Sequence, residues 1–292
     1  MWTVLLTTVL LAQAPAAQPD PHAGHAMPAP TPQAAPAPRD EKLPPSEPQA
    51  EAAVKASPRH GEFVDIKTAS GTPIRTWVVY PERKDKAGVV ILIFDIHGLG
   101  YWIRGVADQL AKEGFIAVVP DLISGTGPNG GGSEAAANDD EVVKLVRGLA
   151  PAEVATRLNA VHDYATKIPA ANGKTATMGF CWGGGVSFAY ATAQPALDAA
   201  VVFYGVSPEA ADLAKIKAPV LGLYGSDDAR VNVTVGPAEA EMKKLGKAYE
   251  VHTYEGAGHA FLRSQDGRDG ANLRATQQAW PRVLEFLRER LK

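Results

Sequence analysis

The chain has 292 residues, and its 29 basic and 32 acidic side chains leave a formal net charge of −3. No basic stripe runs along it, so nucleic acid is not an expected partner. The single cysteine, Cys181, has no partner within the chain for a disulfide bond. The fold must therefore be stabilised by packing, and the one thiol is either reactive or buried.

Residues 1–14 have the pattern of an export signal. An apolar run from Trp2 to Leu11 precedes Ala12-Gln13-Ala14, which has the small-x-small form of a cleavage site. The run of about ten apolar residues is too short to cross a bilayer. We therefore expect an exported protein, periplasmic or secreted, with no stable membrane insertion after cleavage. A buried N-terminal helix is the alternative.

Residues 15–57 are rich in Pro and Ala and contain almost no large apolar side chains. Such a segment buries too little surface to offset its chain entropy, so we expect a disordered tether. His22, His25 and Met27 could bind a soft metal weakly, but a linker without ligands is the favoured interpretation, and no metal site is expected. Residues 58–292 are enough for one domain with its own core.

Strands and helices alternate after an opening hairpin, which predicts an α/β fold with a mostly parallel central sheet and helices on both faces. Residues 122–138 are rich in glycine and are expected to form a mobile cover over the site. The predicted strands are 61–68, 74–80, 89–95, 115–119, 175–178, 199–204, 219–224 and 249–254, and the predicted helices are 101–113, 151–168, 183–193, 236–245 and 273–291.

The segment Gly179-Phe180-Cys181-Trp182-Gly183 has the G-x-S-x-G form of a nucleophile elbow, with cysteine in the serine position. A predicted strand precedes it and a predicted helix follows. A sharp turn between them would expose the sulfur, and the glycines are needed because the turn leaves no room for β-carbons. The helix N-terminus would also favour the thiolate. A lone cysteine is often a core residue, but the elbow favours a nucleophile.

A nucleophilic thiol needs a base, and His259 lies in a glycine-rich loop just after the last predicted strand. Asp228 follows the strand that ends at Tyr224 and is the expected orienting carboxylate, with Asp227 as the competing candidate. The order Cys181, Asp228, His259 is that of α/β-hydrolases. All three residues follow predicted strands, where open α/β sheets build their sites.

The oxyanion of an acyl-transfer reaction needs backbone donors. The amide of Trp182, directly after the nucleophile, is the expected first donor. The second should come from the loop after strand 89–95, where Ile96 is the candidate and His97 is less favoured.

These residues resemble the dienelactone hydrolase family over essentially all of residues 58–292. The strongest likeness is in Gly179-Phe-Cys-Trp-Gly-Gly184, in Tyr254-Glu-Gly-Ala-Gly-His259-Ala-Phe261, and in Ile103-Arg-Gly-Val-Ala-Asp-Gln-Leu110 followed by Pro120-Asp-Leu122. The resemblance implies an α/β-hydrolase fold, a triad of Cys181, Asp228 and His259, oxyanion amides at Trp182 and Ile96, and no cofactor.

Two positions differ from the family pattern. The family has a glutamate that contacts the resting cysteine, and Asp95 matches it with a side chain one methylene shorter. The family also binds the substrate carboxylate with two arginines. Arg263 matches one of them, while no second arginine can be assigned from the sequence.

The expected function is hydrolysis of a small carboxylic ester or lactone through a thioacyl-enzyme, carried out by a monomer without a cofactor. A thioesterase or peptidase with the same triad is one alternative. A non-catalytic binding protein that keeps the fold is another.

Overall fold

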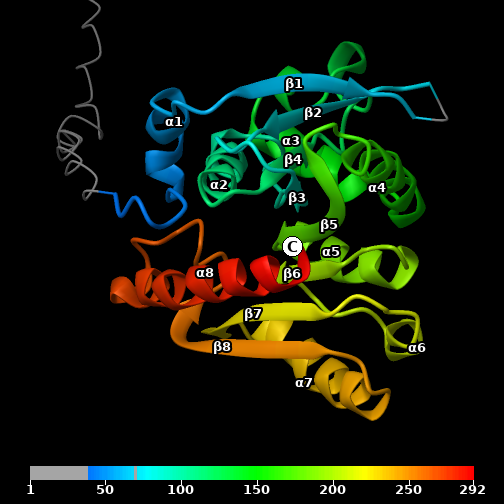
Figure 1. Cartoon of the computed structure of the whole chain (residues 1–292). Coiled ribbons are helices and arrows are strands. Elements are labelled where there is room, and N and C mark those ends of the chain that lie inside the picture. The colour runs from blue at the N-terminus through cyan, green and yellow to red at the C-terminus, as the bar shows by residue number, and fades with distance from the viewer. Residues whose placement is uncertain (1–38, 69–70) are drawn as a thin grey trace, which may run out of the picture. The chain divides into compact units, whose positions relative to one another are not determined.

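The computed structural model describes residues 39–68 and 71–292, in which eight strands form one sheet with the order β1-β2-β4-β3-β5-β6-β7-β8 (Figure 1). The strands are β1 (Gly61–Ile66), β2 (Ile74–Val79), β3 (Ala87–Ile93), β4 (Ile116–Pro120), β5 (Ala171–Phe180), β6 (Ala199–Phe203), β7 (Val220–Asp227) and β8 (Tyr249–Gly258).

Strand direction divides the sheet into two parts. β2 is antiparallel to both β1 and β4, whereas all other neighbouring pairs are parallel. The carboxyl ends of β3, β5, β6, β7 and β8 therefore meet at one edge. The predicted mostly parallel α/β fold is confirmed.

Helices cover both faces of this sheet (Figure 1). α2 packs on β2 and β4 and α8 packs on β6 to β8, while α4 and α5 pack on β3 and β5. The α-helices are α1 (Glu47–Lys55), α2 (Tyr101–Lys112), α3 (Asp139–Gly148), α4 (Pro151–Ala165), α5 (Trp182–Ala193), α6 (Ala210–Leu213), α7 (Ala229–Lys244) and α8 (Ala271–Arg290), and the short 3₁₀ turns are η1 (Pro128–Gly130), η2 (Ser133–Ala135) and η3 (Arg268–Gly270).

The core lies around the central strands. Every residue of β3, β4 and β6 is buried. Parallel strands that are covered on both faces have continuous apolar sequences, and for this reason they could be predicted well from the sequence.

The prediction of a disordered tether is wrong for its last part. Residues 47–55 form α1, and Leu43 and Ala50 are buried against the domain. The ring of Pro45 lies against Gly105 of α2. The amide of Glu47 donates to the Arg263 carbonyl at 2.9 Å. Few but well-placed apolar contacts thus order a segment whose composition is typical of a linker.

Two other predictions need correction. Helix α7 begins at Ala229 rather than residue 236, so Asp228 occupies its N-cap position. Residues 139–148 form α3, which the sequence analysis did not predict. Asn138 caps this helix by accepting a hydrogen bond from the Glu141 amide at 3.0 Å.

The glycine-rich segment 122–138 is attached to the domain by the buried Asp121. The carboxylate of Asp121 accepts hydrogen bonds from the Ser133 amide at 2.7 Å and from its hydroxyl at 2.8 Å. The Ser133 hydroxyl in turn accepts the Leu99 amide at 2.9 Å. No residue of 122–138 lines the cavity at the candidate site, so the expected cover does not lie there.

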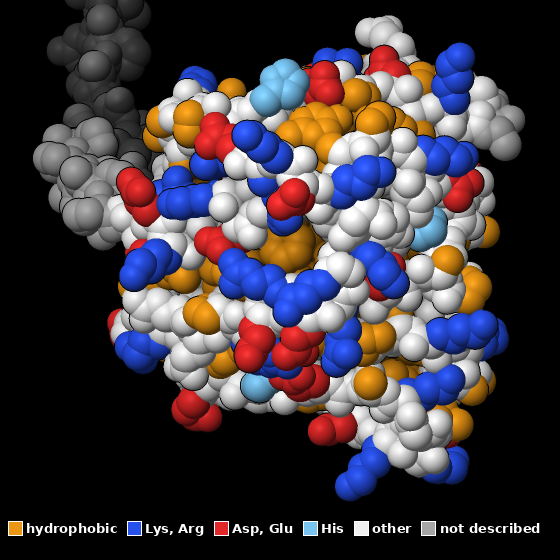
Figure 2. All heavy atoms as spheres, viewed as in Figure 1, with side chains coloured by type: hydrophobic (Ala, Val, Ile, Leu, Met, Phe, Trp, Pro, Cys, Tyr) orange, Lys and Arg blue, Asp and Glu red, His pale blue; other side chains and the backbone are white. Residues whose placement is uncertain are grey.

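The predicted export signal and the His22, His25 and Met27 group lie outside the described residues. Within residues 39–68 and 71–292, no helix has the length and apolar character that a membrane span requires. The same residues hold no group of three or more His, Cys, Asp or Glu side chains suited to a metal ion. Positive and negative side chains are mixed over the face seen in Figure 2.

Candidate active site

The elbow forms as the motif predicts. β5 ends at Phe180, α5 begins at Trp182, and Cys181 between them has φ 55° and ψ −114°. A β-carbon on Gly179 would collide with the Gly183 carbonyl oxygen, and one on Gly183 would collide with the Phe94 carbonyl oxygen. Non-glycine residues adopt this positive φ only when the surrounding structure imposes it. The strained turn leaves Cys181 at the surface of a cavity, half-buried.

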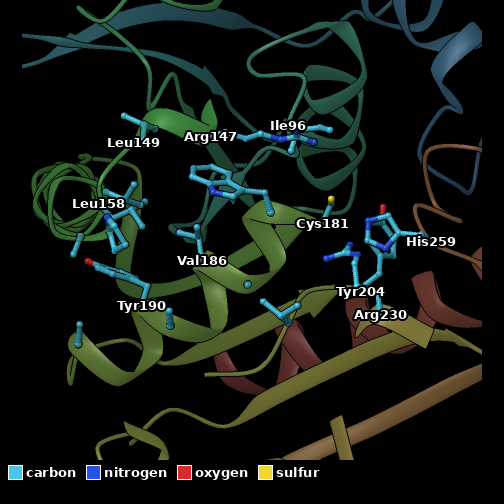
Figure 3. Close-up of a pocket in the computed structure, with 18 residues that line it drawn as sticks. Ile96, Arg147, Leu149, Leu158, Cys181, Val186, Tyr190, Tyr204, Arg230 and His259 are labelled. Atoms are coloured by element: carbon cyan, nitrogen blue, oxygen red, sulfur yellow. The ribbon is translucent and has the colours of Figure 1, made fainter. Parts of the chain in front are cut away.

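His259 follows β8 and lies in the same cavity, with its ring and the Cys181 sulfur both shown in Figure 3. Its Nδ1 is 2.6 Å from Oδ2 of Asp228, a carboxylate only 7% exposed. Its Nε2 is buried and has no hydrogen-bond partner among the described residues. The imidazole is thus oriented at one nitrogen and available at the other, as a general base requires.

The competing carboxylate, Asp227, has a different partner. It forms an ion pair with Arg268 near the surface, and more than half of its side chain is exposed. The alternative that the sequence left open is therefore resolved by geometry, because the carboxylate that contacts His259 belongs to Asp228.

The two residues predicted to supply oxyanion amides, Trp182 and Ile96, line the same cavity as Cys181. The Trp182 amide is close enough to Cys181 to lower the pKa of its thiol by hydrogen bonding. Ile96 lines the cavity, whereas the His97 amide already donates to Asp95 Oδ1 at 2.9 Å. Of the two candidates after β3, His97 thus has an acceptor for its amide already, and Ile96 stays the predicted second donor.

Asp95 and Arg263, the two positions at which the chain was compared with the family pattern, contact each other. Asp95 is 4% exposed, and its Oδ2 accepts a hydrogen bond from Arg263 Nη1 at 2.6 Å. Arg263 also pairs with Glu47 of α1 at 3.0 Å and lies 5.4 Å from the Trp102 ring. It does not line the cavity. Arg263 is therefore part of an Asp95–Arg263–Glu47 ion-pair chain, and its contact with a substrate stays a prediction.

The surroundings of Cys181 raise the pKa of its thiol. Burial raises the pKa of the Cys181 thiol, and the charges of Asp95 and Asp228 raise it further. The Trp182 amide and the Arg230 guanidinium oppose this by lowering the pKa. Burial is the largest of these effects, so the net shift opposes the thiolate that the helix N-terminus was expected to favour.

The cavity contains three functional candidates that sequence analysis missed. Arg147 at the end of α3 and Arg230 at the start of α7 both line it. Tyr204 lies at φ 41° directly after β6, with its ring 5.2 Å from that of His259. Its hydroxyl is buried without a partner among the described residues, and burial raises its pKa, so it remains a donor. Tyr204 could have been found from the sequence, because it lies at the carboxyl end of a predicted strand, where sites of this fold are built.

Together, the parallel sheet, the cysteine elbow and the His259–Asp228 pair define an α/β-hydrolase. The family model of the dienelactone hydrolase family matches residues 74–291. The chain therefore belongs to the dienelactone hydrolase family and is a hydrolase.

Individual relatives agree with this assignment. A protein of Saccharolobus solfataricus named "Putative carboxymethylenebutenolidase" is 31% identical over 250 residues, which cover 75% of this chain and 95% of the relative. A protein of the same name from Salmonella typhimurium is 31% identical over 235 residues, covering 75% and 83%. The crystal structure of a "Putative Dienelactone Hydrolase" from Klebsiella pneumoniae aligns with a TM-score of 0.68 and 27% identity, covering 78% of this chain and 97% of that one.

Proposed function

We propose that this protein hydrolyses carboxylic esters or lactones through a covalent thioacyl-enzyme on Cys181. The observation that carries the proposal is a single cavity holding the elbow cysteine, the available Nε2 of His259 and the backbone at Ile96 and Trp182. The relatives named as carboxymethylenebutenolidases support the choice of a lactone or ester as substrate.

The first half-reaction begins when His259 Nε2 takes the thiol proton as the sulfur attacks the carbonyl carbon. The oxyanion receives hydrogen bonds from the amides of Trp182 and Ile96. The carbon–oxygen bond to the leaving group then breaks, and the His259 imidazolium protonates that oxygen. Asp228 holds the ring in orientation and stabilises its positive charge throughout.

The second half-reaction replaces the alcohol by water. His259 removes a proton from a water molecule, the resulting hydroxide attacks the thioester carbonyl, and the carbon–sulfur bond breaks. The sulfur recovers its proton from the imidazolium, and the carboxylic acid is released. One ester and one water thus give one acid and one alcohol, and no cofactor enters the reaction.

The proton-coupled form of this mechanism follows from the raised pKa of Cys181. A resting thiol is a poor nucleophile, so ionisation has to occur while the substrate is bound and His259 accepts the proton. A thiol that is neutral between turnovers also avoids unproductive reactions with other electrophiles.

The test is trapping of the acyl-enzyme. p-Nitrophenyl acetate should give a burst of p-nitrophenol, and intact-protein mass spectrometry of acid-quenched samples should find one acetyl group on Cys181, the only cysteine in the chain. The Cys181→Ala variant should show neither signal and should lose about 10⁴-fold or more in kcat. Circular dichroism and the Tm of this variant report whether it is folded. A folded variant with wild-type turnover would reject the proposal.

A further inference from the structure

The cavity continues beyond the sulfur as a groove between α4 and α5, with a total volume of about 860 Å³ (Figure 3). Along α5 it is lined by Gly185, Val186, Ala189, Tyr190 and Ala193. These positions recur at intervals of three to four residues, so they form one stripe along the helix. At about 1.5 Å per residue, the stripe extends roughly 18 Å from Cys181 to Ala193.

The opposite wall is built by α4 with the same periodicity. Pro151, Val154, Ala155 and Leu158 line the groove at positions i, i+3, i+4 and i+7. The one polar group at the far end, the Tyr190 hydroxyl, is already engaged with Asn159 Oδ1 at 2.9 Å. This end of the groove therefore presents carbon surface on both sides.

Polar groups gather at the other end. Arg147, Arg230 and His259 lie on the same side of the groove as the Cys181 sulfur in Figure 3, away from Leu158 and Tyr190. The groove is thus polar where the reaction would occur and apolar along the rest of its length. A matching ligand has a polar head and an extended apolar chain.

The position of His259 indicates which part of the ester lies in the groove. Figure 3 shows Cys181 between His259 on one side and Leu149, Leu158 and Tyr190 on the other. A histidine that protonates the leaving oxygen needs the leaving group on its own side. The part bonded to the carbonyl carbon then extends the opposite way, along α5.

We propose that this surface, called here the acyl groove, binds the acyl part of the substrate as an extended aliphatic chain. The inference rests on the proposed function and names its substrate class as esters of medium- or long-chain acids. Ala189 and Ala193 are exposed, so the distal part of the groove is open and a long chain can project from its end. A compact lactone would contact only the part near Cys181.

The experiment measures kcat/KM for p-nitrophenyl esters from acetate to decanoate, each below its aggregation concentration. Burial of one methylene along a partly open groove should raise kcat/KM by about two- to fourfold until the chain fills the stripe. Ala189→Phe should block the middle of the groove and remove most of the preference for octanoate over acetate. Ala193→Phe should affect only the longest chains, since it lies about 6 Å further along the helix.

Ala152→Phe is the matched control, because Ala152 is an exposed residue of α4 that does not line the groove. Its chain-length profile should equal that of the wild type. A flat or falling wild-type profile would overturn the inference, as would an unchanged octanoate-to-acetate ratio in Ala189→Phe. If acetate is hydrolysed through Cys181 and the profile is flat, only the acyl groove is rejected. If acetate hydrolysis does not need Cys181, the proposed function itself is rejected.

Discussion

Two buried carboxylates lie near enough to Cys181 to influence its thiol, and their surroundings differ. Asp228 after β7 and Asp95 after β3 are 7% and 4% exposed, and the charge of each raises the pKa of Cys181. Asp228 contacts the imidazole of His259, a side chain that can act as a general acid or base. Asp95 contacts the guanidinium of Arg263, which offers hydrogen-bond donors only. The same side chain at similar burial can therefore support proton transfer on one side and an ion pair on the other.

The largest effect should come from the Asp228 side. Asp228→Asn should lower kcat/KM on p-nitrophenyl acetate by about 10³- to 10⁴-fold, because the amide no longer stabilises the imidazolium or its orientation. Asp227→Asn is the matched control and should stay within about threefold of wild type, since Asp227 pairs with Arg268 at the surface. Equal losses in both variants would contradict the assignment of Asp228.

On the Asp95 side, the next effect should be a loss of stability when the N-terminal segment that carries Glu47 is weakened. Its ion-pair chain reaches α1, and α1 is attached through apolar residues such as Leu43, which is 4% exposed. Leu43→Ala should lower the free energy of unfolding by about 2–3 kcal/mol, measured by urea denaturation. Leu273→Ala, at an exposed position of α8, should cost less than about 1 kcal/mol. Equal costs would mean that the N-terminal segment is not anchored by packing.

The effect of the Asp95 charge can be measured through the pH dependence of Cys181 alkylation. The rate of Cys181 alkylation by iodoacetamide follows the thiolate fraction, so in the wild type it should still increase above pH 9, because burial and two carboxylates raise the thiol pKa. Asp95→Asn removes a charge that raises this pKa, so the curve should move to lower pH. Arg230→Gln removes a charge that lowers it, so the curve should move to higher pH. An Asp95→Asn curve that is unmoved, or moved upward, would exclude direct electrostatic coupling.

The smallest effect should come from the outer end of the ion-pair chain. Glu47 is about half exposed, and Arg263 keeps its contact with Asp95 when Glu47 is neutralised. Glu47→Gln should therefore change the free energy of unfolding by about 0.5 kcal/mol or less, and kcat by less than about twofold. A cost as large as that of Leu43→Ala would show that charge rather than apolar packing holds α1 in place.

Sequence reasoning named both Asp228 and Asp95, but it predicted the partner of Asp228 and not that of Asp95, for a physical reason. Cys181, Asp228 and His259 each lie in a short motif next to a continuous apolar strand, so local pattern was enough to bring them to one sheet edge. The contacts of Asp95 depend on Arg263 and Glu47, which are 168 and 48 residues away along the chain. Nothing in the sequence near Asp95 signals either partner.

Amino-acid composition also gave a wrong prediction for the last part of the expected tether, which is held by few contacts. Residues 39–57 have the Pro- and Ala-rich character of a linker, yet Leu43 and Ala50 are buried, Pro45 lies against Gly105 of α2, and α1 packs on α2. Arg230 was missed because α7 was predicted to begin seven residues too late, which placed the arginine in a loop. The acyl groove does have a pattern in the sequence, since Gly185, Ala189 and Ala193 form a stripe of small residues at intervals of four along α5.

The raised pKa of the single cysteine has a consequence for the lifetime of the protein under oxidative stress. Peroxide converts a thiolate to sulfenic acid and then to irreversible sulfinic and sulfonic acids, and a neutral thiol reacts far more slowly. Burial and two neighbouring carboxylates raise the pKa of the Cys181 thiol, so in the proposed mechanism its sulfur would be open to such damage mainly in the brief intervals in which His259 holds its proton.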